Sequence, residues 1–102
     1  YDLQDIISVN LERAVQLCVD CGAHVLTSME EDMPSSMAGV FEALHARNKI
    51  SNTCCEQMVK AVGLRNRLVH QYREIDWEIV GSVALERLGD FKRYIRELQD
   101  SR

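Results

Sequence analysis

The sequence predicts an all-α protein folded as an up-and-down four-helix bundle. Four segments carry apolar residues at steps of three and four, which is the spacing of one helix face. Serine, threonine or aspartate stands just before three of these segments, where such residues cap helices. No stretch alternates apolar and polar residues for long enough to indicate a strand. A chain of 102 residues, 46% of them hydrophobic, is expected to form a single domain over residues 1–102.

The first two helices are expected over residues 3–29 and 36–47. The apolar face of the first consists of Ile7, Leu11, Ala14, Cys18, Cys21, Val25 and Met29, and that of the second consists of Met37, Val40, Phe41 and Leu44. An acidic break at residues 30–34 separates them, and Pro34 fits at or near the start of the second helix. Ser35 and Ser36 are the candidate caps of this helix, and Asn48 is expected to end it.

The third helix is expected to carry residues 65–72, the most unusual stretch of the chain. Thr53 and Glu56 have the spacing of a capping box at its start, and Ser51 is a rival cap. Its end is expected between residues 70 and 73, because Asp76 is placed to cap a fourth helix. The apolar face of that last helix consists of Trp77, Val80, Ala84, Leu88, Phe91, Ile95 and Leu98.

Arg65 interrupts the apolar face of the third helix. At about 100° per residue, it falls near the middle of an apolar arc formed by Met58, Ala61, Val62, Leu64, Leu68 and Val69. A buried unpaired charge is costly. The guanidinium must therefore meet a carboxylate, line a wet cleft or bind an anion such as phosphate. Taken alone, Arg65 is equally well explained by a structural ion pair.

Asn66, His70 and Tyr72 follow Arg65 closely. Asn66 and His70 share a helix face, whereas Arg65 and His70 diverge by roughly 140° on a regular helix. Both can reach one ligand only if the helix loosens near its end or if a second copy of the chain supplies its own motif across a two-fold axis. Arg65 and Tyr72 share a face if the helix persists that far. Taken singly, His70 fits a partly buried structural histidine, and Tyr72 an aromatic residue at the edge of the core.

Charge is distributed unevenly along the chain. The formal net charge of −4 argues against a general basic surface that binds nucleic acid. Residues 60–73 nevertheless contain four basic residues and no acidic one, namely Lys60, Arg65, Arg67 and Arg73. Lys60 and Arg67 also fit the solvated face of a helix. No apolar run of membrane-spanning length and no export signal is present, so a cytoplasmic location is expected.

The four cysteines raise the question of a zinc site. Cys18 and Cys21 have the C-x2-C spacing, and Cys54 and Cys55 supply two further sulfurs. All four fall within predicted helices, where cysteine behaves as a small apolar residue, so reduced thiols and no metal are expected. His24 and His45 are expected at helix surfaces or core edges, outside the site. No carboxylate cluster lies near His70, and no motif indicates a cofactor.

The segment 58–64 and the motif after it resemble the HepT-like ribonuclease family of HEPN domains. That family carries an R-x4-H-x-Y signature with a polar residue after the arginine, and Arg65, Asn66, His70 and Tyr72 fill those positions. The resemblance extends over nearly the whole chain. The family usually has another helix before the segment that opens here, so a leading N-terminal helix is expected to be missing.

The resemblance implies a metal-independent endoribonuclease toxin of a toxin–antitoxin pair. Arg65 would hold the RNA phosphate, His70 would act as general base or acid, and Asn66 would orient His70 or a phosphate oxygen. Lys60, Arg67 and Arg73 would contact the RNA. The resemblance also implies an MntA-type nucleotidyltransferase antitoxin that attaches AMP to Tyr72. A homodimer is expected, since one His70 could then act as base and its mate as acid. The alternative is a non-catalytic helical dimer that binds a nucleotidyltransferase.

Overall fold

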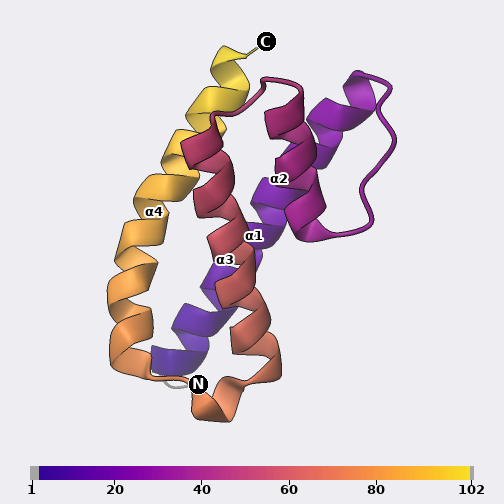
Figure 1. Ribbon diagram of the computed structural model, residues 1–102. Coiled ribbons are helices and arrows are strands. Elements are labelled where there is room, and N and C mark those ends of the chain that lie inside the picture. Colours follow the sequence, from indigo (N-terminus) through magenta and orange to yellow (C-terminus); the bar gives the residue numbers. More distant parts are fainter. Residues whose placement is uncertain (1–2, 102) are drawn as a thin grey trace.

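Four α-helices form the bundle in this computed structural model. The structure describes residues 3–101, and within that range it describes Tyr72 by its backbone alone. The elements are α1 (Leu3–Ser28), α2 (Met37–Ala46), α3 (Asn52–His70), a short 3-10 helix η1 (Tyr72–Glu74) and α4 (Trp77–Asp100). No strand occurs within residues 3–101, so the prediction of an all-α four-helix bundle is confirmed. In Figure 1, α1 crosses behind α2 and α3, and α4 runs beside α3.

The connection between α1 and α2 returns along the bundle before α2 begins (Figure 1). Glu31, just beyond the end of α1, forms an ion pair with Arg47 at the C-terminal end of α2. The C-terminal ends of these two helices therefore meet, so α1 and α2 run in the same direction. The predicted up-and-down order is wrong for this pair, because the long connection after α1 returns the chain to the other end of the bundle. The motif lies at the other end of the long helices, where α3 ends and α4 begins (Figure 1).

Three predicted helix ends are confirmed. The hydroxyl of Ser36 accepts a hydrogen bond from the Gly39 N–H at 3.0 Å and caps α2. Asn48, just after α2, has a left-handed φ of 58°, which asparagine tolerates better than most residues. The carboxylate of Asp76 accepts hydrogen bonds from the first turn of α4 and caps that helix.

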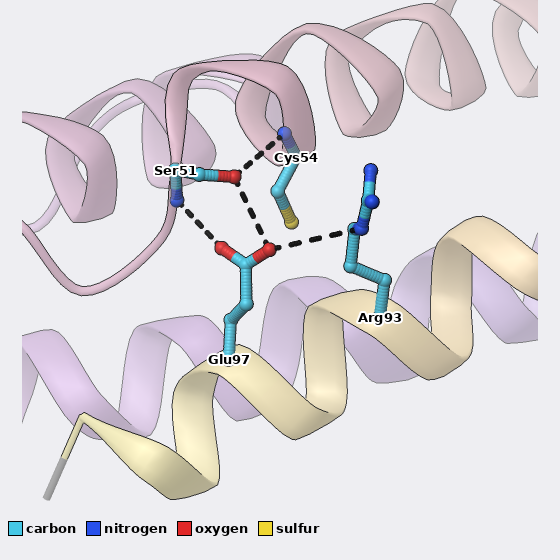
Figure 2. Close-up of polar contacts among 4 residues, drawn as sticks. All are labelled: Ser51, Cys54, Arg93 and Glu97. Carbon is cyan, nitrogen blue, oxygen red and sulfur yellow. Dashed lines mark hydrogen bonds and ion pairs between the residues drawn. The ribbon is translucent and has the colours of Figure 1, made fainter.

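The predicted capping box at the start of α3 is wrong, and the rival Ser51 is the cap. Its hydroxyl accepts from the Cys54 N–H at 3.1 Å, whereas Thr53 lies inside the first turn. Glu97 of α4 accepts hydrogen bonds from the Ser51 N–H at 2.6 Å and from its hydroxyl at 3.1 Å (Figure 2). A capping box uses a local carboxylate for that backbone N–H. Here α4 supplies it, so a local cap by Ser51 and a tertiary contact from Glu97 together define the start of α3.

The core differs from the predicted apolar faces at several positions. Cys21 and Leu88 are exposed, although both were predicted to face inward. Tyr94, absent from the predicted face of α4, is fully buried and donates to the Cys18 carbonyl at 2.7 Å. It also packs edge-on against Phe41, with ring centroids 5.2 Å apart. The hydroxyl explains the error, because a tyrosine can be fully buried once its O–H has a partner.

None of the helices in the described chain is both long enough and apolar enough to span a bilayer.

Candidate functional site

The motif occupies the last turns of α3, which stays helical through His70. The Gln71 N–H still donates to the Arg67 carbonyl at 2.8 Å, the bonding pattern of a regular α-helix. Only at Gln71, with φ −131° and ψ 34°, does the helix end. Loosening of the helix therefore does not bring Arg65 and His70 together. The remaining way for both to reach one ligand is a second copy of the chain.

Arg65 is half-buried, and no carboxylate pairs with it among the described side chains. Its Nη1 donates to Oδ1 of Asn66 at 3.1 Å. Its Nε is buried and has no hydrogen-bond partner in the described part of the chain. By contrast, Arg47, Arg87 and Arg93 each pair with a carboxylate. The description of Arg65 as a structural ion pair is thus not supported, and its charge remains available to an anion.

His70 and Asn66 are both exposed on α3. Val69 lies on the arc between Arg65 and His70, and it is 42% exposed, although the apolar pattern predicted a core residue. The adjacent Leu68 is only 2% exposed, so the core reaches this turn of α3 but leaves Val69 partly uncovered. An apolar side chain among three polar motif residues is a feature that a contact between two copies would bury.

The predicted RNA contacts lie on exposed positions. Lys60, Arg67 and Arg73 are all exposed, the first two on α3 and the third in η1. Lys60 and Arg67 border a hollow of about 390 Å³ between α3 and the start of α4. Sequence reasoning missed two other residues at this hollow, Gly63 and Arg87. The only signal for Gly63 was a glycine inside a helix, which is unfavourable without a reason from packing or function.

Tyr72 lies two residues beyond the end of α3, within η1. Its side chain is outside the described part of the structure. The helix does not continue to Tyr72, so the condition under which Arg65 and Tyr72 would share a helix face is not met.

The cysteines and the other histidines lie in separate environments. Cys18, Cys54 and Cys55 are buried, Cys21 is exposed, and all four are free thiols. Burial raises the pKa of Cys18 and of Cys54 to about 12. No group of three or more metal-binding side chains is found within residues 3–101. His24 is exposed on α1, and Nδ1 of His45 lies 3.3 Å from the Ile50 carbonyl oxygen, so neither belongs to the motif.

Comparison with known proteins places these features in a family. The model of the family described as "Ribonuclease HepT-like" matches residues 1–98. The chain is 34% identical over 95 residues to the mRNA nuclease HepT of Shewanella oneidensis, covering 93% of this chain and 71% of that protein. It is 26% identical over 98 residues to the tRNA nuclease HepT of Aphanizomenon flos-aquae, covering 96% of this chain and 67% of that one.

The chain is also similar to solved structures of toxin–antitoxin complexes. The tri-AMPylated Shewanella oneidensis HEPN toxin in complex with MNT antitoxin superposes with a TM-score of 0.88 at 33% identity, over 96% of this chain and 74% of that one. A toxin–antitoxin complex with AMP-PNP gives a TM-score of 0.88 at 32% identity, over 94% and 73% of the two chains.

Proposed function

The chain belongs to the HepT-like ribonuclease family, and we propose that it cleaves RNA without a metal, through Arg65 and His70. Family membership makes it an endoribonuclease of the toxin–antitoxin class. One observation carries the assignment of the site: Arg65 is half-buried, donates to a neutral amide and has no carboxylate partner among the described residues. Such a group suits a phosphate, which offers two oxygens to its donors.

The chemistry needs two proton transfers and one cationic group. A base removes the proton of the ribose 2′-hydroxyl, the 2′-oxygen attacks phosphorus, and the bond from phosphorus to the 5′-oxygen breaks. An acid then protonates that 5′-oxygen, leaving a 2′,3′-cyclic phosphate and a 5′-hydroxyl. Histidine serves in either role near neutral pH, so we assign proton transfer to His70. Arg65 would bind the non-bridging oxygens and stabilise their added charge in the transition state.

A homodimer completes this site. Arg65 and His70 of one chain diverge by about 140° on a regular helix, and α3 stays regular through His70. A two-fold axis near Val69 would place Arg65 of one protomer beside His70 of its mate and would bury the exposed valines. The two His70 side chains would then divide the roles of base and acid. Asn66, bonded to Arg65, would fix the direction in which the guanidinium faces.

We further propose that modification of Tyr72 inhibits RNA cleavage by this protein. The solved toxin–antitoxin relatives include an AMPylated HEPN toxin bound to an MNT antitoxin. A nucleotidyltransferase partner would attach AMP to Tyr72 of this chain. The added phosphate, two residues from His70, would exclude the RNA phosphate by bulk and by like charge. Both the substrate and the partner would be met in the cytoplasm.

The test of catalysis uses purified protein and single-stranded RNA in EDTA. Wild type is expected to cut the RNA and leave cyclic phosphate ends, whereas His70→Ala is expected to leave it intact. Equal background from both proteins would instead support a non-catalytic dimer that binds a nucleotidyltransferase. Sedimentation of the same wild-type sample gives the oligomeric state, and a monomer that is fully active would overturn the shared site.

The test of control uses co-expression with the product of the adjacent gene. Co-purification and a mass gain of AMP on the peptide that contains Tyr72 are expected, together with loss of RNA cleavage. Tyr72→Phe should remain unmodified and active. Modification at any other residue, with Tyr72 untouched, would refute this part of the proposal.

A further inference from the structure

The hollow between α3 and α4 combines an apolar floor with a basic rim. Leu64 and the α4 residues Ile79, Val80 and Val83 supply apolar surface. Lys60 and Arg67 supply positive charges around it, and Arg87, which is paired with Asp90, supplies a further guanidinium, in a chain whose formal net charge is −4. The carboxylate of Asp76 also borders the hollow, where it accepts the capping hydrogen bonds of α4. Apolar surface beside cations suits a nucleotide, since its base has apolar faces and its phosphate is anionic. The residues that line the hollow include no aromatic side chain, so the base would be held by aliphatic contact.

Arg87 brings an unsatisfied donor to this hollow. Its Nη1 pairs with Asp90 at 2.6 Å, and its side chain is only 15% exposed. Its Nε is buried and has no hydrogen-bond partner among residues 3–101. A buried donor without an acceptor is costly, and a small movement of the Arg87 side chain toward the hollow would let an acceptor on a ligand satisfy it.

Gly63 leaves open space beside α3 at the hollow, as Gly81 and Gly89 do beside α4. Gly63 alone of these three borders this hollow. A Cβ built at Gly63 would meet nothing within 4 Å, so no contact inside the described chain requires a glycine there. Gly22 shows the opposite case, because its Cβ would lie 2.5 Å from the Tyr94 hydroxyl. The absent side chain at Gly63 leaves room for a flat ring to approach the backbone of α3.

The hollow adjoins the proposed catalytic residue. Arg67 lies three residues before His70 on α3, about 4.5 Å along the helix axis and roughly 60° around it. A strand whose phosphate lies at His70 would therefore place the neighbouring nucleotide beside Arg67. Lys60 lies about 15 Å from His70 along the helix axis, at the far side of the hollow.

We propose that this hollow holds one nucleobase of the RNA strand, next to the linkage that is cut. The ring would lie over Gly63 and the apolar floor, Arg67 would contact the adjoining phosphate, Lys60 would contact a phosphate at the far side, and Nε of Arg87 would donate to the base edge. The inference rests on the proposed function, because it places a further part of the same substrate. It adds a contact that would make cleavage depend on the base beside the cut.

The experiment measures binding separately from cleavage. A fluorescent single-stranded oligonucleotide with 2′-O-methyl groups cannot be cut and reports affinity through anisotropy. Gly63→Leu places a side chain in the hollow and is expected to weaken binding by about tenfold, the effect of losing the apolar contact of one base. Gly89→Leu is the matched control, since Gly89 is exposed on α4, does not border this hollow and has nothing within 4 Å of its Cβ. Ile79→Ala, which trims a 61% exposed residue of the opposite wall, should weaken binding without affecting folding.

A series of oligonucleotides, each lacking one base, identifies which base occupies the hollow. Removing single bases from the oligonucleotide should reproduce the tenfold loss at one position beside the cut in wild type and Gly89→Leu, and should have no effect in Gly63→Leu. If wild type cuts RNA and Gly63→Leu binds every oligonucleotide as wild type does, the base site is refuted while the proposed function stands. If binding depends on Gly63 but wild type and His70→Ala cut equally, the proposed function fails and the base site stands. Absence of RNA binding by wild type refutes both.

Discussion

Arg65 donates to the side-chain oxygen of Asn66, its neighbour in sequence, across 3.1 Å, while its own Nε is buried with no partner among the described residues. A buried, unsatisfied guanidinium nitrogen is unfavourable for stability. Its retention beside an exposed histidine fits a site that exchanges stability for ligand binding.

Replacement of Arg65 by methionine separates its effect on stability from its role in RNA cleavage. Arg65→Met should leave the free energy of unfolding unchanged or raise it by about 1 kcal/mol, because it removes the unsatisfied donor. RNA cleavage should fall by at least about 100-fold, as when a group that stabilises transition-state charge is lost. Urea unfolding and an RNA cleavage assay provide the measurements. A destabilisation above about 2 kcal/mol would show that Arg65 is structural. Arg65→Lys keeps the charge and loses the paired donors, so it should also cleave RNA poorly.

Asn66→Asp tests whether the neutral partner of Arg65 matters. The two side chains are nearly isosteric, but the aspartate would form an ion pair with the guanidinium and repel phosphate. We expect kcat/KM for RNA to fall by about tenfold or more, with most of the change in KM. Asn66→Ala removes the same contact without adding charge and should have a smaller effect. Equal losses in both variants would contradict this account.

Gly22 is required by packing, unlike Gly63, Gly81 and Gly89, where a Cβ would meet nothing within 4 Å. A Cβ at this position would lie 2.5 Å from the Tyr94 hydroxyl and 2.8 Å from a methyl group of Leu44. Gly22→Ala should therefore destabilise the fold by about 1–3 kcal/mol, measured by thermal unfolding. Gly89→Ala is the control and should stabilise it by up to about 1 kcal/mol, since alanine favours the helix. Similar effects at both positions would argue against the close contact at Gly22.

The buried thiols predict both selective labelling and alkaline sensitivity. At pH 8 a thiol reagent should modify Cys21 quickly, while the buried Cys18 and Cys54 react only after unfolding, because the thiolate is the reactive form. Burial raises the pKa of both buried thiols from 9.0 to about 12. The stability gained by keeping them protonated is thus complete below pH 9.0 and lost as pH rises toward about 12. Labelling of all four thiols at equal rates in the folded protein would contradict the burial.

The cap that joins α3 to α4 should affect stability and leave catalysis intact. Ser51→Ala and Glu97→Gln are each expected to cost about 1 kcal/mol. The double variant should cost less than their sum, because the two side chains are hydrogen-bonded to each other. RNA cleavage at a permissive temperature should be unchanged, since Ser51 lies at the opposite end of α3 from His70. Loss of cleavage in folded Ser51→Ala would show that the two ends of α3 are coupled.

Local pattern determined most of the helices. The spacing of apolar residues and the capping side chains of Ser36 and Asp76 act within a few residues of sequence, so they could be recognised without coordinates. The same holds for the identity of the motif, since Arg65 disrupts an apolar arc. It holds only in part for Ser51, because its spacing made it one of two candidate caps, and the supporting contact from Glu97 comes from another helix.

The sequence by itself determined the all-α class, four helices and a cationic motif at the end of the third. Tertiary structure alone decided that Tyr94 is buried and Leu88 exposed, that Arg65 has no carboxylate partner among the described side chains, and that α3 keeps Arg65 and His70 on different faces. The physical reason is the distance along the chain over which each kind of interaction acts. Propensity and capping act between neighbours along the chain, whereas burial, ion pairing and access to a ligand depend on which distant segments come to lie beside each residue.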